Sequence, residues 1–181
     1  MQHLILIDST LIVSGLTMLL YKWPHKGIQY TFSQHAAQTK SSYLYYIGFF
    51  VVTLPMLLYF FAVWFVPNLA LPKMFLLFAS IVVIFQIVCT FFPDNGGINT
   101  VLHRILTSIS AFAMIPLVFM IANGSNVSIA GQIISWLTLC IMFISLFIAL
   151  ANQRGYKWAL YLQIAYYGAF LVTIIAATYI G

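Results

Sequence analysis

The stretch Ile129–Ala151, IAGQIISWLTLCIMFISLFIALA, contains no Asp, Glu, Lys or Arg, and it decides the fold class of this chain. A helix that crosses a bilayer needs about 20 consecutive, mainly apolar residues. An α-helix is suited to hydrocarbon because it satisfies its own backbone hydrogen bonds. We therefore predict that this stretch crosses a lipid bilayer as an α-helix.

The composition of the whole chain supports the same conclusion. Of its 181 residues, 64% are hydrophobic and 5% are charged, and the mean hydropathy is +1.05. A chain with so few polar groups cannot coat a water-soluble globule. Lipid is therefore the expected solvent of this protein.

Five other apolar stretches have a similar length. Together the six predict an all-α, polytopic integral membrane protein, a bundle of about six transmembrane helices that forms a single domain over residues 1–181. Only the connection Lys22–Ser42 is long enough to hold structure of its own. The expected spans are Leu4–Tyr21, Tyr43–Val66, Met74–Phe92, Val101–Ala122, Ile129–Ala151 and Trp158–Ile180.

The basic residues are divided unequally between the two ends of such a bundle. Because consecutive connections alternate sides, Lys73 lies alone on one face and the other basic residues share the opposite face. An excess of Lys and Arg marks the cytoplasmic side of a membrane. We therefore expect both termini outside and the basic loops in the cytoplasm, with Lys22, Lys26, Lys40, Arg104, Arg154 and Lys157.

Asp94 and His103 bracket the turn PDNGGINT, residues 93–100, between two expected spans. A carboxylate and an imidazole at facing helix ends can serve acid–base catalysis or bind a metal, so both are candidate catalytic residues. The interpretation we favour is that Asp94 caps the turn and His103 forms a hydrogen bond across it.

A metal site is an alternative use of the same turn. His25 and His35 fall on the same expected face as Asp94 and His103, so these four residues are an alternative set of metal ligands. Their spacing does not match a compact metal-binding motif. We therefore predict no metal and no cofactor.

A polar stripe follows His103 along the expected fourth span. Arg104 is adjacent to it, and Thr107 and Ser110 recur at helical spacing, so this face should contact other helices. Arg104, Thr107 and Ser110 are therefore candidate ligand-binding residues. For the hydroxyl groups we favour helix packing, because such groups in membrane helices mostly bond to the preceding turn or to a neighbouring helix.

Asp8 is the only acidic residue inside an expected span. A buried carboxylate is costly in hydrocarbon and raises the hypothesis of proton coupling. Lys73 is its nearest plausible partner, since both lie toward the outer face, and we favour an ion pair between them, or snorkelling of the Asp8 side chain, over proton coupling. Asp8 would also interrupt the apolar region of a signal peptide, so we expect the first span to be retained.

Small residues recur every fourth position on the last expected span, which lets another helix approach closely. That helix belongs either to the same bundle or to a second copy of the chain, and the sequence leaves a homo-oligomer open. The ridge consists of Ala165, Ala169, Thr173 and Ala177.

Three short segments carry a resemblance to a known family. They are the residues Phe91-Phe92-Pro93-Asp94, the pair His103-Arg104 after a glycine-bearing turn, and Ser33-Gln34-His35. The chain resembles the membrane proteins grouped as domain of unknown function 998, over most of its length. The resemblance implies a compact bundle of about six membrane helices with Asp94 and His103 as family-like polar positions, and it implies no established activity. The family looks distantly similar to membrane proteins of the autophagy-modulator and lipid-remodelling type, which favours a lipid ligand.

Three functions stay open. The first is a non-enzymatic bundle that binds or handles a lipid or other amphiphile, with the 93–100 turn and Lys22–Ser42 forming a polar lid. The second is a membrane-embedded hydrolase or transferase that uses His103 and Asp94, and the third is a small transporter that uses Asp8. We favour the first because the chain contains no Glu and no recognisable hydrolase motif. Its expected partners are membrane lipids and a small amphiphile, not nucleic acid.

Overall fold

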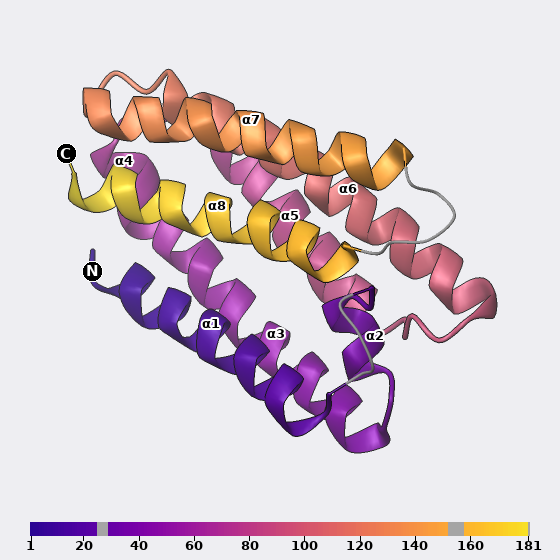
Figure 1. The fold of residues 1–181 in the computed structure, drawn as a ribbon. Coiled ribbons are helices and arrows are strands. Elements are labelled where there is room, and N and C mark those ends of the chain that lie inside the picture. The colour runs from indigo at the N-terminus through magenta and orange to yellow at the C-terminus, as the bar shows by residue number, and fades with distance from the viewer. Residues whose placement is uncertain (25–28, 152–157, 181) are drawn as a thin grey trace.

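The structure of the protein, a computed structural model, describes residues 1–24, 29–151 and 158–180. Over these ranges the regular elements are all helical, and the long helices run up and down along one bundle (Figure 1). In chain order they are α1 (Leu4–Lys22), α2 (Phe32–Ala36), α3 (Lys40–Phe60), the π-helical turn η1 (Phe61–Phe65), α4 (Val66–Asn68), α5 (Met74–Thr90), α6 (Gly97–Ala122), α7 (Ile129–Ala151) and α8 (Ala159–Tyr179).

The helix lengths confirm the predicted all-α membrane bundle. In the described ranges, five helical segments are long and apolar enough to cross a membrane, and α5 is a shorter apolar helix. The second of them joins α3, η1 and α4 into one continuous segment, Lys40–Asn68. It is longer than the predicted span 43–66, because the helix already begins in the polar connection that precedes the apolar run.

The two ends of the chain meet at one end of the bundle (Figure 1). The His3 Nδ1 atom lies 3.0 Å from the Tyr179 hydroxyl, and that hydroxyl donates a hydrogen bond to the carbonyl oxygen of Gln2 at 3.1 Å. The beginning of α1 and the end of α8 are thereby tied together. The opposite end of the bundle carries α2 and the turn between α5 and α6.

The turn between α5 and α6 depends on two glycines. Gly96 and Gly97 have φ angles of +108° and +64°, in the left-handed region that favours glycine. The Gly96 N–H donates to the Thr100 hydroxyl at 2.7 Å, which fixes the first turn of α6. As a result α6 begins at Gly97, earlier than the predicted Val101, and α5 ends at Thr90.

Aromatic rings hold the end of the α3 segment against the beginning of α5. The rings of Phe61 and Phe75 are edge to face, with centroids 5.3 Å apart, and both side chains are buried. Phe65 packs on Phe75 at a centroid distance of 5.6 Å. Aromatic pairs in this distance range are favourable, so the cluster fixes the end of the bundle that lies far from α2.

The predicted ridge of small residues packs α8 onto α7. The Thr173 hydroxyl donates to the Thr138 hydroxyl at 2.7 Å, and Thr138 in turn donates to the carbonyl oxygen of Ala169 at 3.3 Å. A Cβ added at Gly131 would lie 3.6 Å from the Cα of Ala177. Three of the four ridge residues therefore serve contacts within the chain, whereas Ala165 is exposed.

Candidate functional site

A cavity of about 860 Å³ lies at the end of the bundle opposite the two chain termini. It is enclosed by the α2 region, the turn before α6, the first half of α6, the end of α7 and the beginning of α8. Its apolar lining residues are Ala111, Phe112, Leu146, Ala149, Leu150, Ala159 and Leu162. Its polar lining residues are Gln29, Tyr30, Thr31, Ser33, Gln34, Asp94, His103, Arg104, Thr107, Ser108, Ser145, Gln163, Tyr166 and Tyr167.

The short helix α2 is formed by local capping and anchored by α8. The Thr31 hydroxyl accepts from the Gln34 N–H, and the Gln34 side chain accepts from the Thr31 N–H, which is a capping box. The Phe32 N–H donates to the Gln163 side-chain oxygen of α8 at 3.0 Å. The first connection of the chain is thus structured over α2, and this part of it lines the cavity.

His103 is fixed by the end of the preceding helix. Its Nδ1 atom lies 2.8 Å from the carbonyl oxygen of Phe92 and 3.0 Å from that of Cys89. Carbonyl oxygens only accept hydrogen bonds, so Nδ1 carries a hydrogen. The last carbonyls of a helix lack partners within the helix, and His103 supplies one to the end of α5. His103 therefore forms the hydrogen bond across the turn that its sequence position predicts.

Asp94 does not have the capping role that we predicted for it. In the described ranges its carboxylate has no hydrogen bond and no ion pair, and the Thr100 hydroxyl accepts from the turn instead. Asp94 is half-buried and Arg104 is exposed, and both line the cavity. No ion pair joins these two side chains, so the cavity carries one negative and one positive group that do not neutralise each other by contact.

The other two candidate ligand-binding residues lie in different places. Thr107 lines the cavity with Asp94, His103 and Arg104. Ser110 is fully buried, and its hydroxyl donates to the carbonyl oxygen of Val82 in α5 at 3.3 Å. Ser110 therefore packs α6 against α5 and does not line the cavity.

The three described residues of the alternative metal set, His35, Asp94 and His103, do not form a metal site. His35 is buried in α2, with Nδ1 3.5 Å from the carbonyl oxygen of Trp23, and it does not line the cavity. His25 lies outside the described residues. Among the residues that are described, no group of three or more His, Cys, Asp or Glu side chains is placed to bind a metal ion.

The hydrolase interpretation requires Asp94 to orient His103. Nδ1 of His103 is instead directed to main-chain carbonyl oxygens, and Asp94 is not its hydrogen-bond partner. The two residues share a cavity without forming an acid–base pair.

Sequence reasoning missed the contribution of α8 to the cavity. Gln163 accepts from α2, and the Tyr166 hydroxyl donates to the carbonyl oxygen of Ala111 at 2.5 Å, which joins α8 to α6 inside the cavity wall. Ala159, Gln163 and Tyr166 recur at helical spacing, so they lie on one face of α8. That spacing is the sequence signal that could have indicated a functional face.

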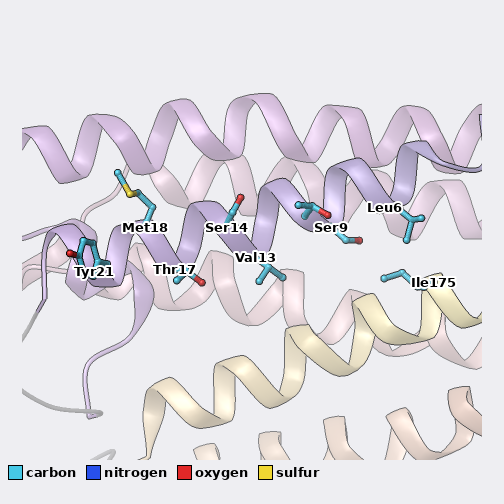
Figure 2. A pocket seen from close by; sticks show the side chains of 9 residues that line it. Leu6, Ser9, Val13, Ser14, Thr17, Met18, Tyr21 and Ile175 are labelled. Carbon is cyan, nitrogen blue, oxygen red and sulfur yellow. The ribbon is translucent and has the colours of Figure 1, made fainter.

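A second, shallower groove of about 590 Å³ runs between α1 and α8. Figure 2 shows Leu6 and Val13 of α1 and Ile175 of α8 pointing into the space between the two helices. Ser14 and Thr17 also line this groove. The groove and the cavity share no lining residue.

The predicted ion pair between Asp8 and Lys73 is wrong. Asp8 is fully buried, and within the described residues neither of its carboxylate oxygens has a hydrogen-bond partner. Lys73 is exposed at the beginning of α5. The Asp8 side chain is directed from α1 into the bundle, whereas the Lys73 side chain is exposed. The two charged groups therefore do not meet.

The cavity therefore combines a carboxylate, a guanidinium and an imidazole with the apolar walls of α7 and α8. Pockets of this kind, mostly apolar with a few placed polar groups, are typical of small-molecule binding sites. A molecule with a charged part and an apolar part would match both kinds of lining. Comparison with protein-family models, with curated proteins and with solved structures found no match for this chain.

Proposed function

We propose that this membrane protein binds or handles an amphiphile, and that its ligand is a membrane lipid held in the cavity between α2, α6, α7 and α8. The observation that carries the proposal is the division of the cavity lining. The polar groups come chiefly from the α2 region and α6, whereas α7 and α8 contribute most of the apolar groups. The headgroup of a lipid would contact the polar lining, and its acyl chain would contact the apolar lining.

Two lining residues support access from the bilayer. Phe112 of α6 is 53% exposed and Leu150 of α7 is 61% exposed, although both line the cavity. Their side chains therefore border both the cavity and the outer apolar surface of the bundle. A lipid with its headgroup inside the cavity would keep its acyl chain in contact with hydrocarbon, which avoids the cost of exposing the chain to water.

The basic residues indicate where the cavity lies along the membrane normal. The described basic residues Lys22, Lys40 and Arg104 lie at the cavity end of the bundle, and Lys73 lies at the other end. We propose that the cavity end faces the cytoplasm and that both termini lie outside. The resemblance to domain of unknown function 998 stays a prediction and adds no activity to this proposal.

Obstruction of the cavity tests the proposal. Ala149→Trp places a large ring on the α7 wall, and Ala130→Trp places the same ring on an exposed position of the same helix outside the cavity. The binding of fluorescent lysophospholipids with several headgroups would be measured with the full chain in detergent. We expect Ala149→Trp to weaken binding about tenfold or more, a loss of about 1.4 kcal/mol, and Ala130→Trp to bind like the parent.

The folded state of both variants would be checked by circular dichroism and by the thermal midpoint. If the parent binds none of the lysophospholipids, or if a folded Ala149→Trp variant binds as well as the parent, the cavity is not an amphiphile site.

A further inference from the structure

We infer that the headgroup recognised in this cavity is zwitterionic, with a primary ammonium that contacts Asp94 and a phosphate or carboxylate that contacts Arg104. This inference rests on the proposed function, because it names the class of amphiphile for the same cavity. It starts from the two opposite charges that line the cavity without contacting each other.

The backbone positions of these two charged residues are set by a structured turn. Arg104 directly follows His103, whose imidazole is hydrogen-bonded at 2.8 Å to the carbonyl oxygen of Phe92. Asp94 lies two residues after Phe92, so this hydrogen bond links the two backbone segments that carry the charged residues. The left-handed glycines Gly96 and Gly97 determine the path of the turn between them. A structured turn therefore carries Asp94 and Arg104 to the cavity, where the two side chains form no ion pair with each other.

Each charge suits one half of a zwitterionic headgroup. The planar guanidinium of Arg104 can donate two parallel hydrogen bonds to a phosphate or a carboxylate. A primary ammonium carries three N–H donors, and the carboxylate of Asp94 has only acceptors. A ligand with both groups would provide each side chain with the ion pair that it lacks in the described structure.

The balance of charge disfavours the other headgroup classes. A purely anionic headgroup would be attracted by Arg104 and repelled by the Asp94 carboxylate in the same cavity. A quaternary ammonium carries no N–H group, so it cannot donate a hydrogen bond to Asp94. The headgroup with a primary ammonium and a phosphate is the one that satisfies both side chains.

Three lysophospholipids with the same acyl chain test the inference. Their headgroups are phosphoethanolamine, phosphocholine and phosphoglycerol, and their binding to the full chain in detergent would be compared at one salt concentration. We expect the phosphoethanolamine lipid to bind about tenfold more tightly than the other two, which corresponds to one charge-assisted hydrogen bond.

Charge variants assign the two halves of the headgroup. Asp94→Asn should remove the preference for phosphoethanolamine and keep binding to all three lipids, because the ammonium loses its partner while the phosphate keeps Arg104. Arg104→Gln should weaken binding of all three. Asn95→Ala and Lys40→Gln change exposed residues at the same end that do not line the cavity, so both should bind like the parent.

The outcomes separate this inference from the proposed function. Equal binding of the three lipids, or an unchanged preference in Asp94→Asn, overturns the headgroup assignment even where Ala149→Trp still weakens binding. Absence of any lipid binding by the parent overturns the proposed function itself. Free phosphoethanolamine serves as a soluble competitor: we expect it to compete only weakly, and tighter binding than that of the lipid would make a soluble zwitterion the ligand in place of a membrane lipid.

Discussion

His103 of α6 caps the end of α5 through Phe92: its Nδ1 atom donates to the Phe92 carbonyl oxygen at 2.8 Å, and the Cys89 carbonyl oxygen accepts from the same atom at 3.0 Å. The imidazole is nearly fully buried. One side chain thus joins two neighbouring helices and at the same time fixes the turn that carries Asp94 at the cavity. Only a variant that keeps an N–H donor at position 103 can therefore separate the structural role of His103 from a functional one.

Removal of the His103 donor should destabilise the bundle. We expect His103→Ala to lower the free energy of unfolding by about 1–3 kcal/mol, because the Phe92 carbonyl oxygen loses its side-chain donor, whereas the Cys89 carbonyl oxygen keeps the Phe92 N–H. His103→Asn retains an N–H donor near the position of Nδ1 and should lose much less. Thermal and denaturant unfolding in one detergent would compare the two variants. Equal losses would show that the hydrogen bond to Phe92 does not contribute to stability.

The contact of α1 with α3 depends on the absence of a side chain at Gly15. A Cβ there would overlap the ring of Phe49, whereas a Cβ at Gly48 would meet no atom within 4 Å. We expect Gly15→Ala to destabilise the protein by about 1–3 kcal/mol, as overpacking of a core does, and Gly48→Ala to stabilise it slightly, because alanine has a higher helix propensity than glycine. Unfolding midpoints measure both. Partial rescue of Gly15→Ala by Phe49→Leu would identify the ring as the obstacle, and a neutral Gly15→Ala would contradict the packing.

The sequence was sufficient for five of the six expected membrane spans, because hydropathy is a property of each segment alone, and the remaining one forms the shorter apolar helix α5. The uncharged stretch Ile129–Ala151 forms one helix of that range, and the glycine pair correctly indicates a turn. The role of His103 across the turn was also accessible, since its two acceptors are only 11 and 14 residues away. Local features of this kind are visible in a single sequence.

The remaining parts of the site depend on contacts between distant segments. Gln163 contacts a residue 131 positions away, and Tyr166 contacts one 55 positions away, so neither partner could be found from spacing. Asp94 was expected to cap the turn because aspartate often does, but Thr100 competes for the same N–H. Asp8 was paired with Lys73 from their expected depth in the membrane, and depth does not reveal the direction in which a helix turns its side chain.

The predicted ion pair of Asp8 and its observed burial lead to opposite expectations for the stability of a protein in which Asp8 is replaced. If Asp8 were paired with Lys73, its replacement would leave an uncompensated charge and would cost about 3–5 kcal/mol. Because the carboxylate has no partner in the described residues, we expect Asp8→Asn, which has the same shape, to be no less stable than the parent. Unfolding in detergent at neutral pH measures this. Lys73→Gln should be neutral too, and a strong coupling between the two substitutions would restore the ion pair.

The proposed orientation makes a prediction about two exposed lysines at opposite ends of the bundle. Lys40 begins α3 at the cavity end, and Lys73 precedes α5 at the other end. In a background that lacks Cys89 and Cys140, Lys73→Cys should react with a membrane-impermeant maleimide on intact cells, since the positive-inside rule places it outside. Lys40→Cys should react only after the membrane is opened. The reverse pattern would place the cavity, its basic residues and its lipid site on the outer leaflet, and the lipids of that leaflet would then be the ligands to test.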